Sequence, residues 1–241
     1  MTPVKSLLSK LTKRNDQTTA PSLLTKSCHD VDFLLWMLCS SEEAGQGEPH
    51  LPSTVSSSGS LHLFRKSRKP ATAGSATNCM RCPLGDSGCS FSAKNIYLEI
   101  QSRNWFGGCV FESDNNVCDD QYVKITWPEL TQPAKTATLH MVAQTKKMGS
   151  RYSNIYGELG EVHADSRQIV VEDFSTGETK THYPHIEGMG HGGGDQVLVR
   201  QFVLACDRVK NHGWEAPRAQ NELIACTLDE VLRSYAMVFA A

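Results

Sequence analysis

Residues 23–38 read LLTKSCHDVDFLLWML and carry the strongest helical pattern of this 241-residue sequence. Phe33, Trp36 and Met37 follow the i, i+3, i+4 spacing of one helix face, so the pattern predicts a buried apolar stripe there. We expect a single helix that packs on the rest of the fold along this stripe.

The N-terminal end of the same stretch is polar. Lys26, His29 and Asp30 also follow the i, i+3, i+4 spacing, which would place three ionisable groups on one face of a continuous helix. Such a cluster on a rigid element is a candidate catalytic site. The alternative is an ordinary helix start in which His29 is satisfied by a neighbouring side chain.

The bulk composition is that of an ordinary globular protein. The chain is 39% hydrophobic and 21% charged, with a net charge of −2. It has neither the basic excess that favours nucleic-acid binding nor an apolar run of about 18 residues that could span a membrane. Nine cysteines without a secretion signal indicate a reducing, cytoplasmic location with free thiols. Residues 1–20 are predicted to be an N-terminal extension.

A cysteine-rich loop is predicted over residues 78–92. Cys79 and Cys82 have the C-x2-C spacing with which two thiolates commonly bind one tetrahedral zinc ion, and Cys89 follows as a third candidate ligand. The sequence offers three candidates for the fourth ligand: Cys109, Cys118 or a histidine. The alternative is a packed cysteine-rich loop that holds no metal.

Residues 107–182 are predicted to form an antiparallel meander that begins with a strand at 107–113. The segments are short, rich in β-branched and aromatic residues, and separated by turn residues. Val123, Ile125 and Trp127 alternate with polar side chains, so we expect one face of this sheet to be covered and the other to be polar.

A glycine-rich segment, GMGHGGGD at residues 188–195, precedes a predicted helix. Asp195 is well placed to cap that helix or to lie in its first turn, and His191 stands at the other end of the glycine run. The predicted apolar stripe of the helix is Leu198, Phe202, Ala205 and Val209. This corner could face a ligand, and the alternative is a hinge with an ordinary cap. A last helix is predicted from about residue 219 to 239.

The segments KSCHDVDFLLW, CVFESDNNVCDDQYV, IYGELGEVHAD and GHGGGDQVLVRQF occur in that order. In this order the chain resembles the C-terminal domain of Gfo/Idh/MocA oxidoreductases, the family of glucose–fructose oxidoreductase and inositol dehydrogenase. The resemblance covers residues 21–241. It implies an α+β fold, with an open, mainly antiparallel β-sheet, helices packed on one face, and a homo-oligomer assembled through the sheet.

The resemblance also implies a site for a sugar, polyol or related alcohol. His29 matches the histidine that faces the substrate and moves a proton while hydride leaves for NAD(P). Lys26 and Asp30 are its candidate partners, because Thr25 stands where many members have an aspartate. Two residues match the loop that closes on the substrate: His191 and Asp195.

Two parts of the family pattern are missing from this sequence. They are the N-terminal Rossmann domain with its G-x-G-x-x-G turn and the Glu-Lys-Pro segment. The expectation is therefore a truncated substrate-binding part of an NAD(P)-dependent oxidoreductase, without its own cofactor motif and not necessarily active alone. One alternative is a non-catalytic binding or oligomerisation module that uses the open sheet face. Another is a scaffold stabilised by zinc.

Overall fold

In the computed structural model the chain forms two compact units, each containing helices and an antiparallel sheet. Unit 1 comprises the described residues of Met1–Met148 and Asp229–Ala241, and unit 2 comprises those of Gly149–Leu228. The structure describes residues 20–39, 48–96, 107–145, 151–165, 167–185, 193–224 and 226–241. The fold is therefore α+β with open antiparallel sheets, as the sequence predicts.

The sheet of unit 1 has three antiparallel strands, with β2 in the centre. The strands are β1 (Thr54–Ser60), β2 (Asp120–Trp127) and β3 (Lys135–Val142). Val123 of β2 pairs with Ser57 of β1 and with Leu139 of β3, which defines the register across the sheet.

One face of β2 is buried and the other is open. Val123, Ile125 and Trp127 are each at most 1% exposed, whereas Tyr122 on the opposite face is 46% exposed. The alternation predicted from the sequence is therefore confirmed, because successive side chains of a strand point to opposite faces.

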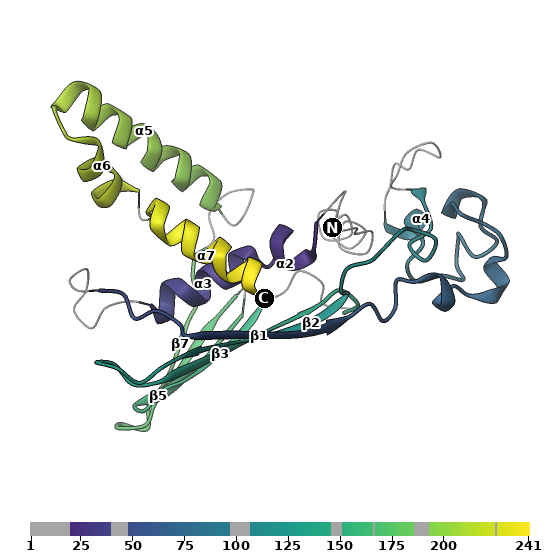
Figure 1. The fold of residues 1–241 in the computed structure, drawn as a ribbon, viewed down its shortest axis with the longest axis horizontal. Coiled ribbons are helices and arrows are strands. Elements are labelled where there is room, and N and C mark those ends of the chain that lie inside the picture. The colour runs from purple at the N-terminus through teal and green to yellow at the C-terminus, as the bar shows by residue number, and fades with distance from the viewer. Residues whose placement is uncertain are drawn as a thin grey trace. The chain divides into compact units, whose positions relative to one another are not determined.

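Three helices of unit 1 lie on one face of this sheet (Figure 1). They are α2 (Ser22–Thr25), α3 (Cys28–Leu38) and α7 (Leu228–Ala240). A single apolar core joins these helices to the sheet. It includes Val31 and Leu35 of α3, Ile125 and Trp127 of β2, and Val238 of α7.

The predicted single helix over residues 23–38 is instead two helices. The chain turns at Lys26 and Ser27, whose backbone N–H groups both donate to the carbonyl oxygen of Ser22, at 2.9 and 3.1 Å. Lys26 has φ −136° and ψ −53°, which is outside the helical region. The helical hydrogen-bond ladder therefore stops there and starts again at Cys28.

The predicted buried stripe of this stretch is wrong. Phe33 and Trp36 are exposed, and their rings pack on each other with centroids 6.2 Å apart. Met37 is half-buried, and the buried side chains of α3 are Val31 and Leu35, which share a face at i, i+4 spacing. The sheet covers that face instead of the predicted one.

The segment between β1 and β2 folds around a second small core of Phe64, Val110, Phe111 and Ala143. Residues 107–113, predicted as a strand, form turns with one isolated β-bridge between Gly108 and Asn78. Paired glycines at 107–108 disfavour an extended strand, which explains the difference. The short helices here are η1 (Lys66–Arg68), η2 (Ala71–Ala73), η3 (Cys79–Arg81) and α4 (Ala93–Ile96).

The carboxylate of Asp119 fixes the start of this segment. Asp119 is 2% exposed and accepts hydrogen bonds from the backbone N–H groups of His62, Leu63 and Phe64, at 2.7, 2.8 and 2.9 Å. One side chain therefore satisfies three consecutive backbone donors where the chain leaves β1.

Unit 2 contains a four-stranded sheet in which each strand pairs with the next along the chain. The strands are β4 (Tyr152–Tyr156), β5 (Gly160–Asp165), β6 (Ile169–Asp173) and β7 (Thr179–His182). The helices are α5 (Gly194–His212) and α6 (Ala216–Leu223), which pack on each other. None of the helices in the described part of the chain has both the length and the apolar composition that crossing a membrane requires.

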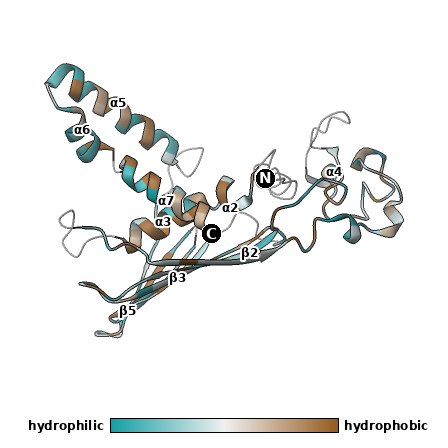
Figure 2. Cartoon of the chain, in the orientation of Figure 1, coloured by the Kyte–Doolittle hydropathy of each residue, from teal (hydrophilic) through white to brown (hydrophobic). Residues whose placement is uncertain are grey.

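One prediction about the C-terminal helices is wrong. The helix expected over residues 219–239 is divided between α6 and α7, because the chain leaves the helical conformation at Ile224. The predicted stripe of α5 is buried only at Ala205. Its other members, Leu198, Phe202 and Val209, are exposed, and Figure 2 shows hydrophobic residues at several turns of this helix.

Candidate functional site

His29 lies in the first turn of α3 with its side chain exposed. The helix that carries it is held by polar contacts as well as by the core. Lys135 of β3 donates from Nζ to the carbonyl oxygen of Leu38 at 2.9 Å, and Ser234 of α7 donates from Oγ to Asp32 Oδ1. The backbone of His29 is therefore part of a fixed element of unit 1.

The predicted partners of His29 stand on either side of the helix start. Lys26 lies in the turn before α3 and Asp30 in the first turn of α3, and both are half-buried. They do not share one face of a continuous helix with His29, as the spacing predicted, because the helix is interrupted at Lys26. Thr25 donates from its hydroxyl to the carbonyl oxygen of Pro21 at 3.0 Å.

The second group of predicted site residues, His191 and Asp195, belongs to the sequence of unit 2. α5 begins at Gly194 after Gly193, whose φ of 92° is a left-handed conformation that favours glycine. Asp195 lies in the first turn of α5, which confirms its predicted position, and it is exposed. His191 lies outside the described residues.

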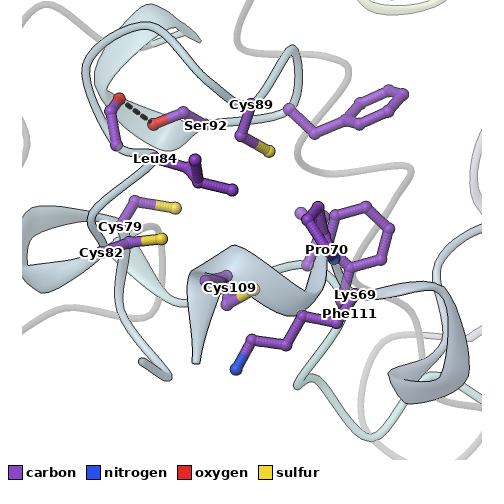
Figure 3. Close-up of a pocket in the computed structure, with 13 residues that line it drawn as sticks. Lys69, Pro70, Cys79, Cys82, Leu84, Cys89, Ser92, Cys109 and Phe111 are labelled. Atoms are coloured by element: carbon purple, nitrogen blue, oxygen red, sulfur yellow. Dashed lines mark hydrogen bonds between the residues drawn. The ribbon is translucent and has the colours of Figure 1, made fainter. Parts of the chain in front are cut away.

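The cysteines of the predicted loop surround one small cavity of about 20 Å³ (Figure 3). Cys79, Cys82 and Cys89 line it, and Cys109 is a fourth lining residue. Of the candidates for a fourth ligand, Cys118 is not in the lining. We call this the cysteine cavity.

Long-range backbone contacts bring Cys109 to the other three cysteines. Asn78 forms the isolated β-bridge with Gly108, and the N–H of Cys109 donates to the carbonyl oxygen of Thr77 at 2.8 Å. These contacts join two segments about thirty residues apart, a pairing that cysteine spacing alone does not reveal.

Burial raises the pKa of the Cys89 and Cys109 thiols above the ordinary value of a cysteine. The backbone N–H of Phe91, bonded to Cys89, and that of Phe111, bonded to Cys109, partly oppose this effect by lowering the pKa of each thiol. Both thiols are therefore protonated near neutral pH. Within the described ranges no three Cys, His, Asp or Glu side chains are arranged closely enough to hold a metal ion.

The sequence did not point to the lysine at the edge of the cavity. Lys69 lines the cavity with its aliphatic chain, and its Nζ donates to Glu112 Oε1 and to the carbonyl oxygen of Ala76, both at 2.7 Å. This hydrogen bond from Lys69 lowers the pKa of Glu112. No sequence signal connects these residues, because Lys69 and Glu112 meet only in the folded chain.

We compared the chain with known protein families, with curated proteins and with solved structures. It matches none of them.

Proposed function

We propose that the chain is the substrate-binding part of an NAD(P)-dependent oxidoreductase of the Gfo/Idh/MocA type, acting on a sugar, polyol or related alcohol. The observation that carries this proposal is the exposed His29 at the start of a helix fixed by the sheet and by α7. A catalytic base must keep its position relative to the bound alcohol, and a packed helix supports that requirement.

The proposed chemistry is removal of a hydroxyl proton by His29 while hydride passes from the same carbon to the nicotinamide. Histidine is suited to this step because its ordinary pKa is closest to neutrality. Lys26 and Asp30 would orient the substrate or the imidazole, and His191 and Asp195 would bind substrate. Every strand pair among the described residues is antiparallel, so they supply no βαβ unit for a dinucleotide. The nicotinamide would bind elsewhere. All nine cysteines are free thiols, which supports a cytoplasmic location.

We expect His29→Ala to weaken the binding of a sugar or polyol to the chain about three- to tenfold, the value of one lost hydrogen bond. The measurement is a ligand-observed NMR titration of the full chain against a panel of aldoses and polyols. His62→Ala is the matched control, because His62 is also exposed in unit 1 but bonds to Ser60 at 2.7 Å. If no panel member binds, or if His29→Ala binds as tightly as the unchanged chain, the proposal fails.

A non-catalytic module that pairs with a second copy of itself is the alternative function. No residue of β4, β5, β6 or β7 is fully buried. Ile155, Val162 and Val171 lie side by side across three of these strands, so they form an apolar row on one face. An antiparallel sheet normally has its apolar face covered, which favours a partner on this face.

In that case we expect Val162→Glu to turn a dimer into a monomer, because it places a charge in the centre of the apolar row. Sedimentation velocity at micromolar concentration measures the change. Glu161→Lys is the matched control, since residue 161 points to the opposite face of the same strand. A monomeric unchanged chain would argue against the module.

A further inference from the structure

We propose that Cys79, Cys82, Cys89 and Cys109 together bind one divalent, thiophilic metal ion of the zinc class. Figure 3 shows these four side chains around the cysteine cavity, coming from different parts of the loop region. Four thiolates around a single ion are the donor set of structural zinc sites. The proposal does not depend on the oxidoreductase function.

The first pair of ligands is built by the knuckle around η3. Asn78 accepts a hydrogen bond from the N–H of Met80 at 2.9 Å, and the N–H of Cys82 donates to the carbonyl oxygen of Cys79 at 3.3 Å. The chain then passes close to the knuckle at Gly85, where a Cβ would overlap the carbonyl oxygen of Cys79. This compact turn presents two thiols from four residues of chain, as C-x2-C metal sites do.

The second pair comes from farther along the chain and is held by its own contacts. Ser92, which is buried, donates from its hydroxyl to the carbonyl oxygen of Gly85 at 2.5 Å and ties the Cys89 segment to the knuckle. Cys109 is held beside the knuckle by its hydrogen bond to Thr77. The segments that carry the four ligands are therefore joined through hydrogen bonds that do not involve the thiols.

Peptide N–H groups beside the second pair partly oppose the effect of burial on these thiols. The backbone N–H of Phe91 bonds to the thiol of Cys89, and those of Phe111 and Glu112 bond to the thiol of Cys109. Such N–H donors stabilise a sulfur that has lost its proton and orient it toward an ion. A bound divalent cation would supply the positive charge that stabilises thiolates at this buried site.

The size and lining of the cavity select the class of ligand. A volume of about 20 Å³ holds a single small sphere, so it suits one ion rather than an iron–sulfur cluster of several atoms. Beside Lys69 and Ser92, most of the rest of the wall is formed by apolar side chains, among them Leu84, Phe91 and Phe111. They offer no oxygen ligands, which disfavours calcium and magnesium.

Binding draws the four sulfurs together. They are not at ligand spacing in the described chain, so rotation about χ1 and small loop shifts must bring each sulfur to about 2.3 Å from the ion. Four metal–sulfur bonds form, the thiol protons pass to solvent, and no group is oxidised or reduced. The apparent affinity therefore falls as the pH is lowered, because protons compete with the ion for the sulfurs.

The test is the metal content of the full chain after exposure to zinc and dialysis, measured by inductively coupled plasma mass spectrometry. We expect about one zinc per chain, and loss of at least nine-tenths of it in Cys109→Ser. Cys118→Ser is the matched control, because Cys118 is also half-buried in unit 1 but lies outside the cavity. It should keep the full zinc content. Unchanged zinc in Cys109→Ser, or none in the unchanged chain, overturns the proposal.

A second measurement needs no variant and tests the proposed metal site even if Cys109→Ser fails to fold. In the unchanged chain loaded with Co²⁺, four thiolates give an intense sulfur-to-cobalt charge-transfer band and the visible bands of tetrahedral cobalt. Zinc should displace the cobalt and remove these bands. Octahedral spectra, or bands that persist after Cys79, Cys82, Cys89 and Cys109 are alkylated, would rule out the site.

Discussion

Replacing Trp127 with alanine is expected to lower the free energy of unfolding by about 3–5 kcal/mol, the usual cost of removing a buried aromatic side chain. Trp127 is 1% exposed and is the largest fully buried side chain of the described residues. Its core joins β2 to α3 and to α7, so the cavity left by the indole would weaken three elements together. Chemical denaturation followed by far-ultraviolet circular dichroism measures the change.

Tyr122→Ala is the matched control for this prediction. Tyr122 is an aromatic residue of the same strand, but it lies on the open face beside His140, with ring centroids 5.2 Å apart. We expect it to cost less than about 1 kcal/mol. Equal losses in Trp127→Ala and Tyr122→Ala would mean that the helices do not cover the sheet on the Trp127 face.

Replacing Asp119 with alanine should lower the free energy of unfolding by about 3–5 kcal/mol, because it leaves three backbone donors without their charged acceptor. The donors are the N–H groups of His62, Leu63 and Phe64. Phe64 lies in the second core, so the loss reaches the loop that carries the cysteines. Chemical denaturation gives the loss, and hydrogen exchange of residues 62–64 locates it.

Asp120→Ala separates this effect from a general loss of negative charge. The Asp120 carboxylate pairs with His140 Nε2 at 2.9 Å on the exposed side of the sheet, and such pairs contribute less than about 1 kcal/mol. We expect residues 62–64 to keep their protection in Asp120→Ala and to lose it in Asp119→Ala. Unchanged protection in Asp119→Ala would contradict the assigned role of its carboxylate.

The strand at the centre of unit 1 was predictable because its sequence alternates strictly. Val123, Ile125 and Trp127 stand at every second position and point to one side of the strand. This period of two indicates both that the segment is a strand and which of its faces is buried. The same alternation could not reveal that the strands divide into a three-stranded and a four-stranded sheet. That division depends on which strands meet, and the residues of a single strand carry no information about it.

The face and the interruption of α3 were harder to predict. Residues 33–38 are all apolar, so no period distinguishes the side that meets the sheet from the side that carries Phe33 and Trp36. The interruption did have a signal. Ser27 followed by Asp30 matches the S-x-x-D pattern of a helix start, although the structure shows no side-chain cap there.

Part of the cysteine cavity could be predicted from the sequence. The spacing of Cys79, Cys82 and Cys89 indicated three thiols that could meet, and the structure places all three on one cavity. Cys109 and Cys118 were both candidates by sequence, because both follow the loop and neither has a characteristic ligand spacing to it. The bridge between Asn78 and Gly108 distinguishes them, and it is a contact that forms only on folding.

The insertion of unit 2 between β3 and α7 has a consequence for the order in which the chain acquires structure during synthesis. The pairing of β4 to β7 is local, so that sheet can form once residue 182 has left the ribosome. The core around Trp127 also needs Val238, which is translated later. Unit 2 can therefore fold on the ribosome before α7 is available to cover its part of the apolar face of β2. During that interval this part of the face is open to aggregation and to chaperones.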